Sequence, residues 1–210
     1  MVYRNKKLFL TVGLLTFLAL MPMSCGLVCT DSCGCSPNFP EQKLLIKSFE
    51  VLTVAGDGQR IQPTLTQPYD QVFKAIRIKD FDLVSLAEPD FFQPWTLGAA
   101  FACSPPPVES IEKLRNIEII NLSEQTLADG TVLKLGETIT PYFGMNDFFA
   151  QGLIPVNDFL KNNKDLVLED FFKLGFTKNP GKPINLEITI RIVMENGKEF
   201  ILNNQIHSIR

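Results

Sequence analysis

The chain is poor in the side chains that most enzymes use for acid–base and metal chemistry. Its 210 residues include one histidine, one tryptophan and three tyrosines. The histidine, His207, lies close to the C-terminus, where a Ser-His-Asp triad would have to be built on a fraying end. We therefore expect His207 to be a solvent-facing residue of the last strand, and we expect no enzymatic activity.

Recognisable ligand-binding loops are also lacking. The sequence has no glycine-rich phosphate loop and no calcium loop of alternating Asp and Asn. Glu88 and Asp90 are one of many carboxylate pairs available among 23 acidic residues, and no pattern distinguishes one pair from another. A carboxylate-dependent hydrolase is thus the weakest of the functional hypotheses, and the sequence predicts no cofactor.

The start of the chain contains the strongest targeting signal. A cationic stretch precedes an apolar run over 8–21, which would span roughly 21 Å as a helix, short of the ~30 Å hydrocarbon core of a bilayer. This pattern predicts a removable lipoprotein signal peptide over residues 1–24. Met23-Ser24-Cys25 resembles a lipobox, in which Cys25 is the lipidation site, and two or three acyl chains would hold the protein on a membrane. Plain secretion and an uncleaved anchor are the alternatives.

Removal of residues 1–24 would leave an acidic mature chain. The signal contains three of the 20 basic residues and none of the 23 acidic ones, so 17 basic residues and a formal charge of −6 remain. This charge disfavours nucleic acid as a partner and leaves no basic patch for anionic lipid. The expected contacts are the membrane, through the N-terminal lipid, and a protein partner in the cell envelope.

Residues 25–43 contain four of the five cysteines and no apolar period, which predicts a tether. If Cys25 carries the lipid, four cysteines of the chain remain. Thiols outside the membrane commonly pair, and these four allow three disulfide connectivities. Because a bridge between Cys33 and Cys35 would be strained, we expect one of them to pair with Cys103. A metal site is the alternative, although the cysteine spacing matches no common zinc pattern. The disulfide candidates are Cys29, Cys33, Cys35 and Cys103.

From residue 44 the sequence breaks into short apolar runs separated by turn clusters, a pattern typical of an all-β fold. Val156–Asn163 is the one expected helical turn, and Leu166–Phe176 is ambiguous between strand and helix. We predict a single β-rich domain over 44–210, an antiparallel β-sandwich (immunoglobulin-like) with little helix; a small β-barrel is the alternative. The expected strands before the last hairpin are Leu44–Val54, Val72–Ile78, Phe81–Leu86, Thr96–Cys103, Ile111–Leu122, Val132–Leu135 and Glu137–Phe143.

The C-terminal residues have the clearest pattern. Every even position over 184–195 is apolar, which predicts a strand with one buried face. A two-residue turn at Asn196-Gly197 would set even residues opposite odd ones, whereas a three-residue loop over 195–197 keeps the apolar residues together. We expect that loop, with a type I turn and Gly197 left-handed in a G1 bulge. The expected pairs are Ile192 with Phe200, Ile190 with Leu202, and Leu186 with Ile206.

Phenylalanine is common, at 17 residues, and Asp-Phe-Phe recurs at Asp90–Phe92, Asp147–Phe149 and Asp170–Phe172. Adjacent residues on a strand point to opposite faces, so outward rings would form a patch for a partner or an apolar ligand. The simpler interpretation is that these rings belong to the core or are covered by a neighbouring loop. The best candidates for an exposed aromatic patch are Phe91, Phe92 and Trp95, because Pro89 and Pro94 indicate a loop.

A short signature, Ala100-Phe101-Ala102-Cys103-Ser104-Pro105-Pro106, precedes an Ile-rich strand at Asn116–Asn121. With the lipobox and the closing strand–turn–strand, it resembles a family of uncharacterised envelope lipoproteins from Bacteroidota. That family is a domain of unknown function. The resemblance therefore implies an envelope location and a β-rich fold, and it supplies no catalytic residues.

Three hypotheses for function follow. The first is a non-catalytic interaction or structural module, lipid-anchored in the cell envelope, with its lipid in the outer membrane and its body facing the periplasm or the cell surface. The second is a carrier or sensor of a small apolar or glycan ligand, which an enclosed Phe-lined cavity would favour. The third is a hydrolase, which two facing carboxylates in a cleft would favour.

Overall fold

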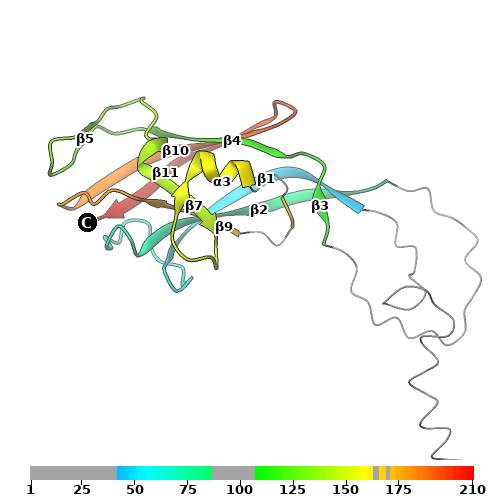
Figure 1. The fold of residues 1–210 in the computed structure, drawn as a ribbon, viewed down its shortest axis with the longest axis horizontal. Helices are drawn as coiled ribbons and strands as arrows, with labels where there is room; N and C mark the ends of the chain where they lie inside the picture. The colour runs from blue at the N-terminus through cyan, green and yellow to red at the C-terminus, as the bar shows by residue number, and fades with distance from the viewer. Residues whose placement is uncertain (1–41, 87–106, 163–165, 169–170) are drawn as a thin grey trace, which may run out of the picture. The chain divides into compact units, whose positions relative to one another are not determined.

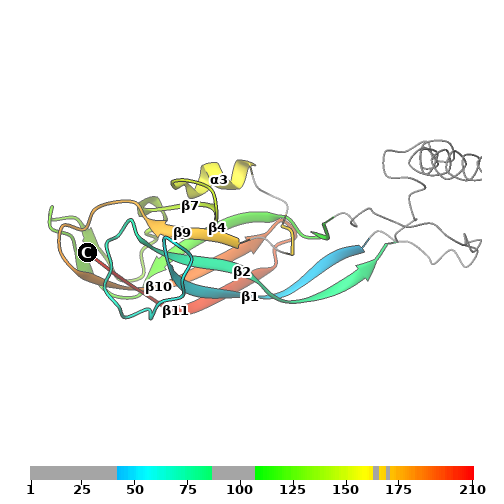
Figure 2. The ribbon, with the colours of Figure 1, turned by 90° about the horizontal axis from the view of Figure 1, so that it is seen from below.

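The computed structural model describes residues 42–86, 107–162, 166–168 and 171–210. Residues Gln42–Leu86 and Pro107–Arg210 form one compact unit. It is an all-β, largely antiparallel sandwich with little helix, as the sequence predicts, and Figures 1 and 2 show its layers from two sides. Within the described residues, no helix is both long enough and apolar enough to cross a membrane.

The larger sheet has the strand order β3-β1-β2-β9-β7-β8. Its two long strands, β1 (Gln42–Ala55) and β2 (Val72–Ser85), pair antiparallel over most of their length, with an irregularity at Ser48. Phe81–Leu86, expected as a separate strand, continues β2 through residue 85. The other strands of this sheet are β3 (Glu109–Ser110), β7 (Phe143–Asp147), β8 (Ile154–Pro155) and β9 (Phe171–Phe176).

The smaller sheet has the order β11-β10-β4, so that β4 (Leu114–Asn121) is an edge strand. The central strand, β10 (Ile184–Met194), buries every even residue and is flanked on its other side by β11 (Glu199–Ile209). A separate short hairpin joins β5 (Gln125–Thr126) and β6 (Val132–Leu133). The alternation in the C-terminal sequence thus places the apolar face of β10 in the core.

Within the described residues, two short helical elements lie among the strands. The helix α3 (Val156–Asn162) follows Pro155, where the sequence predicts it. The expected strand Glu137–Phe143 instead contains a 3₁₀ turn, η2 (Thr140–Tyr142), before β7 begins. Pro141 accounts for the difference, because proline has no N–H to donate to a ladder and fits the first turn of a helix.

Pairs of aromatic rings pack among the aliphatic side chains of the hydrophobic core. Phe49 of β1 and Phe200 of β11 meet edge to face with ring centroids 4.9 Å apart. Phe159 of α3 packs on Phe172 of β9 at 5.4 Å in the same manner. A buried side chain of this size stabilises the fold by roughly 1.5–3 kcal/mol, so these rings hold the two layers and the helix together.

The turn end of the β10–β11 hairpin confirms the expected register. Ile192 lies opposite Phe200 and Ile190 lies opposite Leu202. The loop has three residues, since the Met194 N–H donates to the Lys198 carbonyl at 2.9 Å. Gly197 is left-handed, with φ of 87°. The burial argument therefore gives the correct loop length.

The far end of the same hairpin differs from the prediction. Leu186 lies opposite His207, not Ile206, because the register shifts between Ile188 and Ile190. Between the pairs that Ile188 and Ile190 form, β10 has one residue, Thr189, and β11 has two, Asn203 and Asn204. The extra residue is therefore in β11, where Asn204 has φ of 54°. A bulge of one residue exchanges the two faces of a strand beyond it, and so the C-terminal part of β11 presents its odd residues to the core.

Candidate functional site

The bulge in β11 changes the position of the only histidine. His207 has no exposed surface, so the expectation of a solvent-facing residue was wrong. Its ring lies 6.1 Å from the ring of Phe143, centroid to centroid. Neither ring nitrogen has a hydrogen-bond partner among the described residues. Burial, with a smaller contribution from the charge of Lys74, lowers the pKa of His207 to about 3, so the imidazole is neutral near pH 7.

Lys74 of β2 is the second buried titratable group. Its side chain is only 1% exposed, and its Nζ donates to the Thr53 hydroxyl at 2.7 Å and to the Ile206 carbonyl. No carboxylate pairs with it in the described part of the chain, and burial lowers its pKa to about 8. Lys74 shares the even phase of Val72 and Ile76, a signal in the sequence that points it inward.

These buried groups lie away from the surface of the protein. Lys74, Thr53 and His207 lie between the sheets, and none of the three lines the two surface hollows described below. Among the residues that the structure describes, no group of three or more His, Cys, Asp and Glu side chains is placed to hold a metal ion.

The first hollow, here called the aromatic hollow, has a volume of about 540 Å³. Phe149 at its rim is 93% exposed. The ring of Phe148 lies 5.3 Å from that of Phe149 and 6.4 Å from that of Phe171, in both cases edge to face. Two of the three Asp-Phe-Phe copies therefore meet here. The lining residues are Leu52, Val54, Gly58, Arg60, Ala75, Arg77, Ile78, Phe148, Phe149, Leu168 and Phe171.

The charged side chains of the aromatic hollow are both cationic, although the chain as a whole is acidic. The guanidinium carbon of Arg77 lies 5.3 Å from the centroid of the Phe171 ring, and Arg77 also pairs with Glu50. Arg60 forms no ion pair with any described residue. The hollow thus combines an apolar floor with positive charge, a combination that suits an acidic and apolar ligand.

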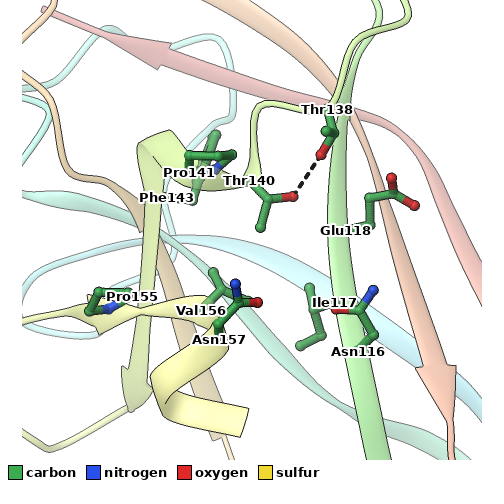
Figure 3. Close-up of a pocket in the computed structure, with 10 residues that line it drawn as sticks. All are labelled: Asn116, Ile117, Glu118, Thr138, Thr140, Pro141, Phe143, Pro155, Val156 and Asn157. Atoms are coloured by element: carbon green, nitrogen blue, oxygen red, sulfur yellow. Dashed lines mark hydrogen bonds between the residues drawn. The ribbon is translucent and has the colours of Figure 1, made fainter.

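The second hollow, here called the edge groove, has a volume of about 440 Å³ and lies beside β4 (Figure 3). Residues 116–118 of β4 form one wall, and η2 and the start of α3 form the other. The hydroxyl oxygens of Thr138 and Thr140 are hydrogen-bonded at 3.0 Å at one end. The lining residues are Asn116, Ile117, Glu118, Thr138, Thr140, Pro141, Phe143, Pro155, Val156 and Asn157.

The site residues expected from the sequence lie outside the described residues. They are Cys25, Cys29, Cys33, Cys35, Phe91, Phe92, Trp95 and Cys103. The Asp-Phe-Phe recurrence includes the three rings of the aromatic hollow, although the simpler interpretation placed such rings in the core or under a neighbouring loop. No local pattern marks the edge groove, because residues 116–118 and 155–157 become neighbours only in the folded chain.

No protein-family model and no curated protein sequence matches the chain. Among solved structures, it is similar to the C-terminal domain of the Streptococcus agalactiae AgI/II polypeptide BspA, with 14% identity and a TM-score of 0.25. That match covers 81% of this chain and 50% of the other. A mutant of that domain gives 14% identity and a TM-score of 0.26 over 78% of this chain and 46% of the other. The chain thus spans about half the length of these structures.

Proposed function

We propose that the chain is a non-catalytic module of the cell envelope, anchored by lipid at Cys25, that binds a partner protein through the aromatic hollow. The observation that carries the proposal is the exposure of Phe149, 93% of whose surface is open to solvent. Burial of a phenylalanine side chain is worth roughly 1.5–3 kcal/mol, so the exposed ring of Phe149 leaves this free energy available for binding. Contiguous exposed aromatic surface next to arginine is typical of binding sites.

The expected partner surface is acidic and apolar. Arg60 and Arg77 face the hollow, and no acidic residue lines it. Apolar partner side chains would cover the rings, and a carboxylate would bind Arg60, which has no ion pair of its own among the described residues.

The test of this interaction places a photo-crosslinking phenylalanine at position 149 of the chain in its native host. The adduct is identified by mass spectrometry, and the purified partner is then titrated against full-length variants. We expect Phe149→Ala and Arg60→Glu each to weaken binding at least tenfold, a change of about 1.4 kcal/mol. Leu135→Ala is the control, because Leu135 is also exposed, at 65%, and lies outside the hollow. Equal affinities for wild type, Phe149→Ala and Arg60→Glu would overturn the proposal.

Anchoring is tested separately. Cys25→Ala is expected to release the protein from membranes, because the thiol is the acceptor of the lipid, whereas Cys29→Ala is expected to leave it bound. Mass spectrometry of the mature N-terminus gives the second readout. An unmodified N-terminus elsewhere than Cys25 would contradict the anchor while leaving the aromatic hollow open to its own test.

A disulfide between Cys103 and either Cys33 or Cys35 belongs to the same proposal, since the envelope lies outside the reducing cytoplasm. It would close a loop of about 70 residues, worth roughly 4 kcal/mol in the chain-entropy model. Peptide mapping without reductant is the measurement, and a free Cys103 thiol in the oxidised, folded protein would exclude the bridge.

A second candidate is a carrier of a small apolar ligand. The volume of the aromatic hollow, about 540 Å³, is in the range of small-molecule sites. Its exposed rim at Phe149 favours a partner protein, because a carrier encloses most of its ligand. Dodecanoate is a suitable probe, and saturable binding that Arg60→Glu abolishes would favour the carrier. Neither hollow supplies the two facing carboxylates that the hydrolase hypothesis requires.

A further inference from the structure

A third hollow, here called the polar hollow, lies on the outer face of the smaller sheet and has a volume of about 350 Å³. Unlike the aromatic hollow, it has no aromatic ring among its described lining residues. Figure 1 shows β5 and the C-terminus, which border it, at the same end of the unit. The lining residues are Thr64, Ser123, Gln125, Asn185, Glu187, Ile206 and Ser208.

The far end of the β10–β11 hairpin forms the floor of the polar hollow. Asn185 lies opposite Ser208, and Glu187 lies opposite Ile206. Asn185 and Glu187 alternate with buried residues of β10 and therefore point away from the core. Beyond the bulge the odd residues of β11 enter the core, so Ile206 and Ser208 point outward as well. The bulge that buries His207 thus also builds this floor.

One wall is the segment that follows β4. The Leu122 N–H donates to the Glu187 carbonyl at 2.7 Å, which keeps the segment beside β10. Asn121 has no exposed surface, and its side-chain nitrogen donates to the Ser123 carbonyl at 2.6 Å. The Ser123 N–H in turn donates to the side-chain oxygen of Asn121 at 3.4 Å. These bonds fix the position of Ser123 without any ligand.

A second wall is the segment that precedes β2. The Gln67 N–H donates to the Ser208 carbonyl at 3.3 Å, and the Arg210 N–H donates to the Gln67 carbonyl at 2.9 Å. Thr64, which lies shortly before Gln67 in the chain, lines the hollow. Main-chain hydrogen bonds therefore hold both walls in place, and a preformed site of this kind loses little binding free energy to ordering.

Two hydroxyl groups in the polar hollow have no hydrogen-bond partner in the described part of the chain. The Ser123 Oγ is buried without one. Ser208 is only 2% exposed, and its hydroxyl group makes no hydrogen bond to any described residue. Buried polar groups are nearly always hydrogen-bonded, because an unpaired one keeps its full desolvation penalty. The two hydroxyls therefore indicate that a polar ligand completes the hollow.

The chemistry of the lining specifies the class of ligand. Three hydroxyl and two carboxamide side chains line the hollow, and they donate and accept hydrogen bonds as the hydroxyl groups of a saccharide do. Ile206 offers an apolar surface to the C–H groups of a sugar ring. Glu187 is the one charged residue among the described lining residues, and it forms no ion pair within the described chain. Its carboxylate favours an amino group on the sugar and repels an acidic one.

We propose that the polar hollow is a second binding site, which takes a small saccharide without acidic groups. It shares no lining residue with the aromatic hollow and is independent of the function proposed there. The hydroxyls of Ser123 and Ser208 form hydrogen bonds with the sugar, and Glu187 selects against acidic sugars.

The test titrates the isotope-labelled, full-length chain with glucose, glucosamine and glucuronate, which differ in charge, and follows backbone amide shifts by NMR. The expected result is saturable shifts of the Ser123, Glu187 and Ser208 amides at millimolar glucose and glucosamine, with no change at Phe149. Glucuronate should bind at least about fivefold more weakly than glucosamine. The absence of saturable shifts with all three sugars at tens of millimolar, or shifts confined to the aromatic hollow, would overturn the proposal.

A matched pair of variants tests the hydroxyls. Ser208→Ala removes a group that makes no hydrogen bond within the described fold, so the amide spectrum away from the hollow should stay unchanged. We expect this variant to weaken glucose binding about fivefold. Thr126→Ala is the control, because Thr126 is exposed and follows Gln125 along β5 but does not line the hollow. Equal affinities of wild type, Ser208→Ala and Thr126→Ala would overturn the proposal.

A second pair tests the selection by charge. Glu187→Gln should bring the affinities for glucosamine and glucuronate to within about twofold of each other, while Glu195→Gln should leave the preference for glucosamine as it is in wild type. Glu195 is a suitable control because it is exposed and lies outside the hollow. An unchanged preference for glucosamine in Glu187→Gln would overturn the role given to this carboxylate.

Discussion

The turn end of the β10–β11 hairpin sets Ile192 against Phe200, whereas its far end sets Leu186 against His207. Both ends are buried in the same core, and both contain one residue with positive φ, Gly197 in the loop and Asn204 in the bulge. The turn end buries apolar side chains. The far end buries an imidazole beside the ammonium group of Lys74. One extra residue in β11 is enough to produce this difference, so the far end should contribute a pH-dependent stability through its buried imidazole.

Acidification should lower the free energy of unfolding through the far end of the hairpin, and this is the largest of the expected effects. The pKa of His207 is about 3 when buried and about 6.5 when unfolded, so the unfolded chain binds a proton over this range and the folded chain does not. Stability from this group is complete above pH 6.5 and is lost as the pH falls toward 3, by up to about 5 kcal/mol at 1.36 kcal/mol per pKa unit. Urea unfolding across this range measures it.

His207→Leu is the variant that removes this titration, and Ile192→Val is the control at the turn end. We expect a flatter pH dependence for His207→Leu and an unchanged one for Ile192→Val, which keeps the histidine. If wild type and His207→Leu lose stability equally with falling pH, the loss comes from other groups.

A rise in pH should remove the destabilising effect of burying the charged form of Lys74. Its pKa is about 8 in the folded chain against 10.5 unfolded, so both states carry the charge below pH 8. Between pH 8 and 10.5 the unfolded chain keeps the proton, and stability should rise by about 3 kcal/mol. Urea unfolding of wild type and Lys74→Met gives the difference. A rise of the same size in Lys74→Met would exclude Lys74 as its source.

Gly197→Val should weaken the turn end by about 1–2 kcal/mol, because it forces a β-branched side chain into the left-handed region. A Cβ at this position would meet no atom within 4 Å, so the cost is that of the backbone alone. Thermal unfolding measures it, and Gly197→Asn should cost less because asparagine tolerates this conformation. Equal stability of wild type and Gly197→Val would show that the loop can adopt another turn.

Asn204→Gly should have the smallest effect, within about 0.5 kcal/mol, because glycine adopts the observed φ of 54° without strain. Thermal unfolding and the exposure of His207 to a histidine-modifying reagent are the two measurements. We expect His207 to stay protected in Asn204→Gly. A reactive His207 in this variant would mean that the asparagine side chain, and not the backbone conformation, maintains the bulge.

Local sequence patterns were sufficient to predict much of the fold. The alternation in β10, the loop over 195–197 and the start of α3 after Pro155 all follow from neighbouring residues, because side-chain direction repeats every second residue in a strand. The expected strands in the described residues also fall mainly within observed ones. The exceptions are the 3₁₀ turn at Pro141 and the merging of two runs into β2.

Tertiary structure decided where His207 and the two hollows lie. The bulge at Asn204 reversed the phase of β11 and buried His207, a residue that the even phase of Phe200, Leu202 and Ile206 would place on the outer face. The aromatic hollow joins the turn after β7 to β1 and β2, and the edge groove joins β4 to α3. The sequence determined the apolar faces because each residue contributes its own hydrophobicity. It did not determine these sites, because a bulge and a contact between distant segments depend on what lies across the sheet.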